Sequence, residues 1–338
     1  MTDVAARPAV RRPSALAQLL WLLCFGLLLC QATIWLQPVS PRLALLDEFA
    51  VQLSGLASLG TAVALLMRRW RLAAVLIVLA ATLAWPLLVH RGQAAVVADG
   101  PRLKAVSANL FYFAKDYQRT LDFLMSSESD IIGLIELTPA WQRALAPLIA
   151  KYPHRVDCFD GGTYCEHMLL SKFPIVKPYA GGAGGDAPII AGGEIDWNGR
   201  RIAVYATHLM WPLAIDQSLP GPTDVAAASY LPGLPPIVQA REAANLALFL
   251  ETQPADLILM GDFNGSPWGR VQRAFRAKTG LDNQAGWDFT WPASLPLAFR
   301  LPLDHVLARG HLVVTEFAGG PEIDSDHFPV IAEISWRD

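Results

Sequence analysis

Three apolar stretches fill the first ninety residues of the chain, and short strands and helices follow them. Residues 15–36 and 72–89 are uncharged runs, and a helix needs about 20 apolar residues to cross the hydrocarbon core. Residues 49–67 are apolar but rich in Gly, Ser and Ala, a composition that suits close helix packing in lipid. The pattern therefore predicts three transmembrane helices within residues 15–91.

The arginines predict the orientation of these helices, because short cytoplasmic loops carry an excess of Lys and Arg. Only Arg42 lies between the first and second runs. Other arginines precede the first run or join the second to the third: Arg7, Arg11, Arg12, Arg68, Arg69 and Arg71. We expect a multi-pass protein of a bacterial-type inner membrane, with a cytoplasmic tail over residues 1–14 and everything after residue 92 outside the cytoplasm. A cleaved signal peptide is the alternative for the first run, but the run is long for such a segment.

From residue 101 onward, short apolar strands alternate with helices and turns. Strands are predicted over residues 103–111, 131–136, 167–171, 189–197, 201–208, 257–260, 303–307 and 330–336. Helices are predicted over residues 117–126 and 236–251, and a long loop over residues 211–236. The pair Asn198-Gly199 is a strong hairpin signal. The alternation predicts a layered α/β (α+β) sandwich over residues 101–338.

Charge separates the same two parts of the chain. The 338 residues are 53% hydrophobic and 17% charged. Residues 1–100 hold 8 Lys+Arg and 4 Asp+Glu, a net charge of +4, whereas residues 101–338 hold 19 and 26, a net charge of −7. A groove that binds nucleic acid normally presents a basic face, so the acidity of the second part disfavours nucleic acid as a partner.

The four cysteines divide between the two parts. Cys24 and Cys30 fall in the first apolar run, where cysteine acts as a small apolar residue. Cys158 and Cys165 flank a Gly-Gly turn that can bring their sulfurs together. In an oxidising compartment a disulfide between them is favoured over two free thiols.

Polar residues follow the predicted strands at several points. Taken singly, each has an ordinary structural explanation: Asn109 as a turn residue, Glu136 as a helix cap, His208 as a core histidine. The order of the short motifs is more specific. They read Ser-Ala-Asn-Leu at 107–110, Ile-Gly-Leu-Ile-Glu at 132–136, Leu-Leu-Ser-Lys-Phe-Pro-Ile at 169–175, Thr-His-Leu at 207–209, Gly-Asp-Phe-Asn at 261–264, Leu-Asp-His-Val at 303–306 and Ser-Asp-His-Phe-Pro-Val at 325–330.

This series resembles the endonuclease/exonuclease/phosphatase superfamily, the DNase I-like proteins, over essentially all of residues 101–338. The resemblance implies a four-layer sandwich in which two β-sheets are flanked by helices. It also implies metal-dependent hydrolysis of a phosphoric ester or anhydride. By position, Glu136 matches the family's Mg²⁺ ligand, with Mn²⁺ as the alternative ion; Asn109 supports it, and Asp326 matches a further acidic residue near the metal.

The same resemblance implies five catalytic residues. His208 and Asn264 match groups that hold phosphoryl oxygens. Asp262 matches the group that orients or deprotonates the attacking water. Asp304 matches the carboxylate that fixes the terminal catalytic His327.

Two positions depart from the family's pattern. Phe111 stands where the repair nucleases of the superfamily carry an acidic residue, and Arg300 precedes Asp304 by four positions, too far for its usual phosphate role. Within the superfamily, spans followed by an extracytoplasmic catalytic domain resemble the bacterial membrane phosphatases of the VanJ type. That branch is linked to glycopeptide resistance and to undecaprenyl pyrophosphate.

The leading hypothesis is a membrane-anchored phosphohydrolase whose substrate is a phosphorylated lipid or small molecule. The loop that contains Trp211, Pro212, Leu213 and Tyr230 would then touch acyl chains, although local packing explains these residues too. An extracytoplasmic DNase-like phosphodiesterase is the alternative, and it requires a basic cleft. A catalytically silent membrane scaffold is a third hypothesis, and it requires lost site residues.

Overall fold

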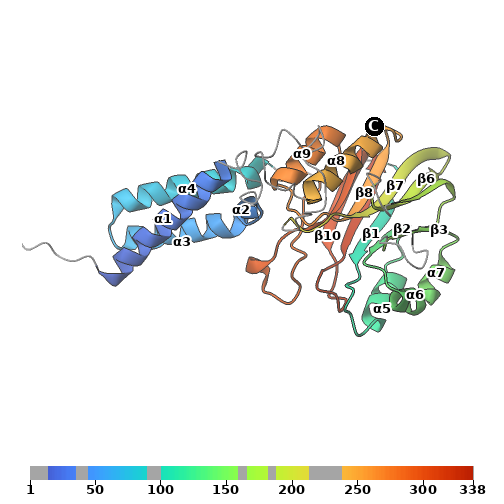
Figure 1. Cartoon of the computed structure of the whole chain (residues 1–338), viewed down its shortest axis with the longest axis horizontal. Helices are drawn as coiled ribbons and strands as arrows, with labels where there is room; N and C mark the ends of the chain where they lie inside the picture. The colour runs from blue at the N-terminus through green and yellow to red at the C-terminus, as the bar shows by residue number, and fades with distance from the viewer. Residues whose placement is uncertain are drawn as a thin grey trace, which may run out of the picture.

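The computed structural model describes residues 14–35, 45–89, 100–158, 166–181, 188–212 and 238–337. Figure 1 shows a helical region followed by a sandwich of two sheets and their covering helices. Most of the predicted N-terminal tail, Cys165, Leu213 and Tyr230 lie outside the described residues.

The helical region contains the three predicted apolar segments and a short helix before the second. Their bounds are α1 Ala15–Trp35, α2 Leu45–Glu48, α3 Ala50–Leu66 and α4 Trp70–Val89. Among the described residues, two segments are long and apolar enough to cross a membrane, Ala15–Ile34 and Trp70–Val89. The three predicted spans are therefore not confirmed as such, since α3 has only 17 residues. Helix α3 ends at Leu66, just before Arg68 adopts a left-handed backbone with φ of 55°.

Small residues let α3 approach its neighbours closely, as its composition predicted. Ala57 and Ala64 are fully buried and lie on one face of the helix with Gly60. A side chain at Gly60 would collide with Leu23 of α1, and it would press on Leu76 of α4. The three long helices consequently pack as a bundle, while many of their large apolar side chains remain exposed.

The remainder of the chain forms two sheets. One has six strands in the order β10-β11-β1-β2-β4-β3, and the other has five in the order β5-β6-β7-β8-β9. The strands of the first sheet are β1 Leu103–Asn109, β2 Ile131–Ile135, β3 His154–Asp157, β4 Met168–Ser171, β10 Leu312–Gly319 and β11 Val330–Trp336. Those of the second are β5 Ile175–Gly181, β6 Ile190–Trp197, β7 Arg200–His208, β8 Leu257–Asp262 and β9 Asp304–Arg309.

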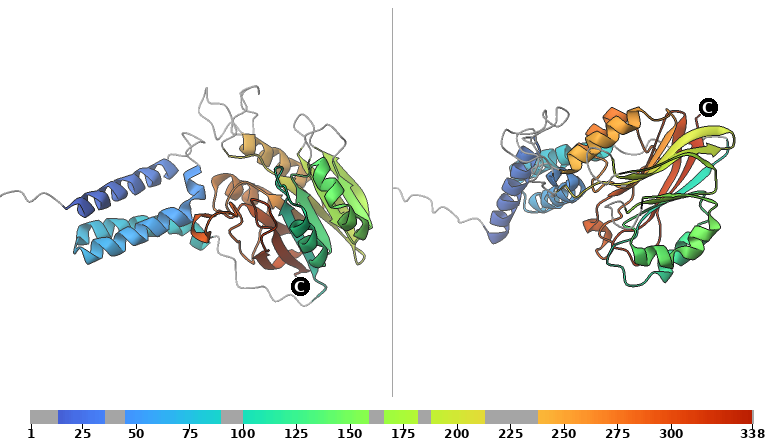
Figure 2. Two further views of the ribbon diagram at one scale, coloured as in Figure 1. Left: turned by 90° about the horizontal axis from the view of Figure 1, so that it is seen from below. Right: turned by 45° about the vertical axis from the view of Figure 1, so that its right-hand side comes forward.

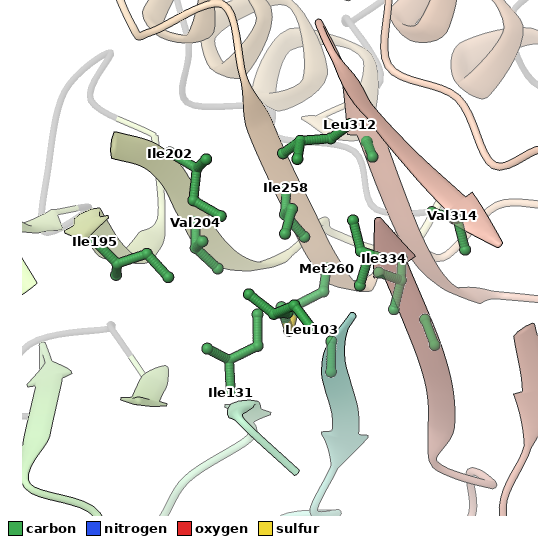
Figure 3. Close-up of a cluster of buried hydrophobic side chains, with 14 of the residues drawn as sticks. Leu103, Ile131, Ile195, Ile202, Val204, Ile258, Met260, Leu312, Val314 and Ile334 are labelled. Carbon is green, nitrogen blue, oxygen red and sulfur yellow. The ribbon is translucent and has the colours of Figure 1, made fainter. Parts of the chain in front are cut away.

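Helices cover the outer face of each sheet, so the sandwich has four layers. The first sheet carries α5 Gln118–Ser126, α6 Pro139–Ala144 and α7 Ala146–Lys151, drawn in green in Figure 2. The second carries α8 Val238–Glu251 and α9 Arg270–Thr279, drawn in orange. A central apolar core joins the inner faces of the two sheets (Figure 3). The predicted two-sheet sandwich is confirmed.

Two local predictions have clear outcomes. Asn198 and Gly199 have φ of 54° and 84° and form the tight turn between β6 and β7, as predicted. Cys24 and Cys30 are free, whereas Cys158 is disulfide-bonded. Its predicted partner, Cys165, lies outside the described residues, so that pairing stays a prediction.

The helical region contacts the sandwich through the segment around α2. The Glu48 carboxylate accepts hydrogen bonds from the backbone N–H and the hydroxyl of Ser266, and Trp268 Nε1 donates to the Glu48 carbonyl at 3.3 Å. Gln52 Nε2 donates to the Arg300 carbonyl at 3.0 Å. Burial raises the pKa of Glu48 from 4.5 to about 7, although the hydrogen bonds from Ser266 lower it. The contact therefore places an ionisable group where its charge is costly.

This pKa predicts how stability depends on pH. A carboxylate whose pKa is raised by folding contributes most below its unfolded pKa, here 4.5, and this contribution is lost as pH rises through 7. A shift of this size corresponds to about 3 kcal/mol. We expect the Tm of the wild type, measured by scanning fluorimetry in detergent, to fall by about 5 °C more between pH 5 and 8 than that of Glu48→Gln. Equal pH slopes for the two proteins would contradict the burial of a charged Glu48.

Candidate active site

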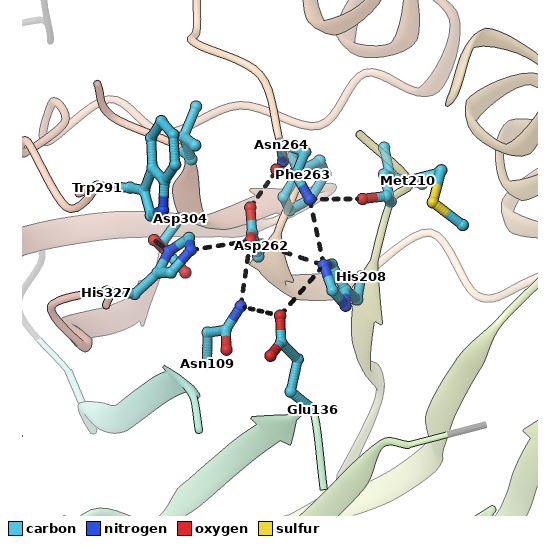
Figure 4. Close-up of polar contacts among 12 residues, drawn as sticks. Asn109, Glu136, His208, Met210, Asp262, Phe263, Asn264, Trp291, Asp304 and His327 are labelled. Atoms are coloured by element: carbon cyan, nitrogen blue, oxygen red, sulfur yellow. Dashed lines mark hydrogen bonds and ion pairs between the residues drawn. The ribbon is translucent and has the colours of Figure 1, made fainter. Parts of the chain in front are cut away.

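The polar residues predicted from the strand ends come together at one edge of the sandwich. Strands β1 and β2 run parallel in one sheet, and β7 and β8 run parallel in the other, so their carboxyl ends meet there. Asn109, from the first sheet, donates through Nδ2 to Glu136 Oε1 at 2.9 Å and to Asp262 Oδ2 of the second sheet at 3.3 Å (Figure 4). The site therefore bridges the two sheets.

Glu136 is held at the end of β2 by an unusual backbone conformation. Its φ is 58°, and its Oε2 accepts a hydrogen bond from the Tyr112 N–H at 2.9 Å. Burial raises the pKa of Glu136 to about 7, and the charges of Asp326 and Asp304 add to this rise, although the hydrogen bond from Asn109 lowers it. Its carboxylate thus lies in a pocket of excess negative charge.

Asp262 is the most central carboxylate of the site. Gly261 before it has a φ of 145°, and any side chain there would collide with the Thr207 carbonyl of β7. Asp262 Oδ1 accepts from the Asn264 N–H at 2.7 Å, and Asp262 Oδ2 lies 3.5 Å from His327 Nε2. Burial raises the pKa of Asp262, which suits a group that takes a proton from water near neutral pH.

His208 and Asn264 lie together on the other side of Asp262. Asn264 Nδ2 is 3.2 Å from His208 Nε2 and donates to the Leu209 carbonyl at 2.9 Å. His208 Nε2 is 3.7 Å from Asp262 Oδ2 and 3.9 Å from Glu136 Oε1. Burial lowers the pKa of His208 to about 4, with a smaller contribution from His327. A neutral His208 can hold a phosphoryl oxygen by a hydrogen bond rather than by charge.

Asp304 and His327 form the predicted pair. His327 Nδ1 is 2.8 Å from Asp304 Oδ2, and the Thr290 hydroxyl accepts the Asp304 N–H at 3.3 Å. Burial alone lowers the pKa of His327, but the carboxylates of Asp304 and Asp262 raise it to about 10. The ligand atoms of Asp262, Asp304 and His327 lie within 4.8 Å of one another, a spacing that would also suit a metal. We favour an ion pair there, because the hydrogen bond and the raised pKa keep His327 protonated.

Asp326 is anchored by a residue that the sequence did not single out. Trp291 Nε1 donates to Asp326 Oδ2 at 3.2 Å, and the Trp291 ring lies 6.3 Å from the ring of His327. His167 was also missed: it is buried, its ring lies 6.4 Å from that of His208, and burial lowers its pKa to about 3. Its position directly before β4 was the available signal.

The two departures from the family's pattern have structural explanations. The Phe111 N–H donates to Asn109 Oδ1 at 3.0 Å, and the Phe111 carbonyl accepts from Trp141 Nε1 at 3.2 Å. Asn109 therefore assists Glu136 as a donor, since its oxygen is already occupied. Arg300 donates to the carbonyls of Leu295 and Ala293, so it braces a loop.

The donor set fits a divalent cation. Four carboxylates, those of Glu136, Asp262, Asp304 and Asp326, surround the site, and the raised pKa values of Glu136 and Asp262 reflect their mutual repulsion and burial. Hard divalent cations such as Mg²⁺ prefer such oxygen ligands. Within this set, Asp304 binds His327 and Asp262 binds the Asn264 N–H, whereas Glu136 and Asp326 bind neither group.

The family model described as "Endonuclease/Exonuclease/phosphatase family" matches residues 106–327, the stretch that carries all eight site residues. The chain belongs to this family. Members of the endonuclease/exonuclease/phosphatase family are phosphoester hydrolases, which agrees with the chemistry of the site. No curated protein matches the chain.

Two solved structures with TM-scores above 0.5 share the fold, and a third structure of lower score is also similar. An endonuclease/exonuclease/phosphatase from Bacteroides vulgatus is 15% identical, with a TM-score of 0.54, and the match covers 70% of this chain and 100% of that one. The catalytic domain of human nocturnin, solved with a bound sulfate anion, is 17% identical with a TM-score of 0.51, covering 71% and 96%. Beta toxin from Staphylococcus aureus, solved with magnesium ions, is 17% identical with a TM-score of 0.49, covering 70% and 100%.

Proposed function

We propose that this protein is a membrane-anchored, metal-dependent phosphohydrolase of the VanJ-type branch that cleaves a lipid-linked phosphoester or phosphoanhydride at the outer membrane surface. The observation that carries the hydrolase is the buried array of Asp262, His327 and Asp304 beside Glu136. Helices α1 and α4 and the arginine distribution support the anchoring and the orientation.

Each residue has a task in this reaction. Asp262 orients a water molecule and accepts its proton as the water attacks phosphorus; the bond from phosphorus to the leaving oxygen breaks, and the leaving group departs as an anion that takes a proton from solvent. On substrate binding, Asn264 and neutral His208 exchange their mutual contact for hydrogen bonds to the phosphoryl oxygens, and protonated His327 stabilises the charge that grows on them. When bound, Mg²⁺ would be held by Glu136 and Asp326 and would polarise a phosphoryl oxygen.

Exposed apolar side chains around the site support a lipid substrate. We call them the apolar rim; they are Tyr112, Phe113, Met210, Trp211, Leu295, Leu297 and Phe299. The ring of Trp211 packs edge-on against Trp291, which contacts the site through Asp326. Leu297 and Phe299 lie on the short helix η4 (Leu297–Phe299). Arg300 follows this helix, and its carbonyl accepts a hydrogen bond from Gln52 of α3. The part of the rim at η4 therefore lies next to the helical region.

The charge of the groove beside Asp326 does not favour nucleic acid. This groove encloses about 520 Å³ and is lined by Phe111, Phe113 and several charged residues. The acidic ones are Asp116, Glu322, Asp324 and Asp326, against the single basic Lys115 of the lining; Arg119 beside the groove pairs with Glu322 and Asp324, so Asp116 and Asp326 carry the remaining negative charge. An acidic surface repels a polyphosphate backbone. We therefore do not propose the nuclease alternative.

Removing two residues of the rim tests the lipid assignment. We expect Leu297→Ser with Phe299→Ser to lower kcat/KM toward a lipid pyrophosphate in vesicles by about tenfold or more, because insertion of each side chain into lipid is worth about 1.5–3 kcal/mol. Turnover of the water-soluble p-nitrophenyl phosphate should not change. Val176→Ser, on edge strand β5, is the matched control because Val176 is also exposed.

Purified full-length protein with Mg²⁺ would be assayed on both substrates, on a phosphodiester lipid and on plasmid DNA. Equal losses on the vesicle-bound and the soluble substrate would show that the rim does not serve lipid. Preferential cleavage of plasmid DNA would reject the lipid assignment in favour of a nuclease.

A further inference from the structure

A segment far from the site in sequence holds the backbone that carries two catalytic residues. Residues 262–266, the catalytic loop, run from Asp262 through Asn264 to Ser266. The N–H and the hydroxyl of Ser266 both donate to the carboxylate of Glu48, which lies 218 positions earlier in the chain. Glu48 directly precedes the turn into α3, so the link runs from the helical region to the active site.

The side chain of Glu48 lies in a buried site that fits its carboxylate. Ser266 and Trp268 are buried, and Trp268 Nε1 also binds the Glu48 carbonyl. A side chain at Gly269 would collide with the Glu48 carboxylate, so the glycine leaves the space that Glu48 fills. Burying a carboxylate is costly unless its oxygens are hydrogen-bonded. Both donors of Ser266 bind one of these oxygens, Oε2, and offset part of that cost.

The catalytic loop is held by contacts from the rest of the sandwich and from the helical region. Asn264 has a φ of 47°, a left-handed conformation that persists only when its surroundings hold it. The domain itself holds the carbonyls of the loop: Gln239 Nε2 donates to the Asn264 carbonyl at 2.8 Å, and His305 Nε2 lies 2.8 Å from the Gly265 carbonyl. At the other end of the loop, the N–H and the hydroxyl of Ser266 both donate to the carboxylate of Glu48, which belongs to the helical region.

We infer that Glu48 is a positioning residue through which the helical region holds the catalytic loop in its active conformation. It touches neither substrate nor reacting atoms, and acts through Ser266 on Asn264 and Asp262. Loss of its acceptor oxygens leaves two buried donors of Ser266 without partners, so the loop relaxes and Asp262 leaves its place beside His327. The inference rests on the proposed hydrolase activity only for its kinetic readout.

The test compares Glu48→Ala, Glu48→Gln and Asp47→Asn in the full-length protein in detergent. Glutamine keeps an acceptor oxygen, and Asp47 is the neighbouring carboxylate, which pairs with Arg273 at 3.6 Å. With p-nitrophenyl phosphate and Mg²⁺, we expect Glu48→Ala to lower kcat by about tenfold or more, since small displacements of catalytic groups are costly, while KM changes by less than about threefold. Glu48→Gln should recover most of kcat, and Asp47→Asn should match the wild type.

Hydrogen exchange of the peptide that spans residues 261–268 gives a readout independent of turnover. Exchange should accelerate in Glu48→Ala and stay slow in the other two variants. Wild-type exchange and kcat in Glu48→Ala would overturn the inference, as would a Glu48→Gln variant as impaired as Glu48→Ala.

Two further cases need their own readout: a wild type without phosphatase activity, and a Glu48→Ala variant that does not fold. If the wild type hydrolyses no phosphate substrate, the proposed function fails and the exchange data alone decide: unchanged protection in Glu48→Ala overturns the positioning role, and lost protection supports it. If Glu48→Ala does not fold, Ser266→Ala removes one of the two donors from the loop side. An unchanged kcat and exchange rate in Ser266→Ala would then overturn the inference.

Discussion

Replacing Glu136 by glutamine is expected to abolish Mg²⁺-dependent phosphate hydrolysis, with a fall in kcat of about a hundredfold or more. Glutamine keeps the size of the side chain and one acceptor oxygen, which can replace Oε1 for Asn109 or Oε2 for the Tyr112 N–H but not both. It removes the charge that Mg²⁺ needs. Isothermal titration calorimetry should accordingly show weaker Mg²⁺ binding, and the melting profile of the domain should be retained.

The control for this variant is Glu194→Gln. Glu194 is a carboxylate of β6 that pairs with Lys177 at 3.0 Å, on the second sheet and outside the active site. It should retain wild-type turnover and Mg²⁺ affinity. A folded Glu136→Gln variant that hydrolyses phosphate at the wild-type rate would show that the metal assignment is wrong.

The second large effect is expected at the pair Asp304 and His327. His327→Ala should lower kcat by about a hundredfold or more, because it removes the cation that faces the growing phosphoryl charge. Asp304→Asn should have a similar effect, since Asp304 orients the ring of His327 and keeps it protonated. The double variant should be little worse than either single one, because the two residues act as a unit.

Kinetics on a soluble phosphoester would measure these three variants beside His311→Asn. His311 is exposed and lies 3.0 Å from Asp256, so it forms a His–Asp pair away from the site. That control should keep full activity. Additive losses in the double variant, or a His327→Ala variant as active as the control, would refute the proposed coupling.

Much of this architecture could be predicted because local patterns decide it. The apolar runs give the helices α1, α3 and α4, and the buried strands β1, β2 and β8 read as short apolar segments. The site residues were predicted from the resemblance of the ordered motifs to the family, and the structure shows why they assemble: polar residues at the ends of parallel strands meet at the same edge. Asn109, Glu136, His208 and Asp262 all lie at such strand ends.

Elements without such a pattern were missed. Strand β5 is largely exposed and contains Pro178, and β3 has four residues of which three are polar, since both lie at sheet edges. Helix α9 is rich in arginine, and its apolar positions are few. Edge strands and short amphipathic helices bury little surface, so they leave little trace in hydrophobic periodicity.

The contact between Glu48 and Ser266 had no local signature at all. In the sequence, Glu48 is one acidic residue next to an apolar run, and its partner lies in another domain. The contacts of Arg300 also have no local signature, because its guanidinium donates to carbonyls of Leu295 and Ala293 that come together only in the folded loop. Contacts of this kind depend on tertiary structure, which periodicity does not encode.

The strand order of the two sheets has a consequence for dividing the chain. In the first sheet β1 pairs with β11, and in the second β7 pairs with β8, so a cut between residues 208 and 257 leaves strands of both sheets in both pieces. The amino-terminal piece would keep Glu136 and His208, and the carboxyl-terminal piece would keep Asp262 and His327. Neither piece could be active alone. Hydrolysis would return only when both sheets re-form together, which would make the protein a reporter of fragment complementation.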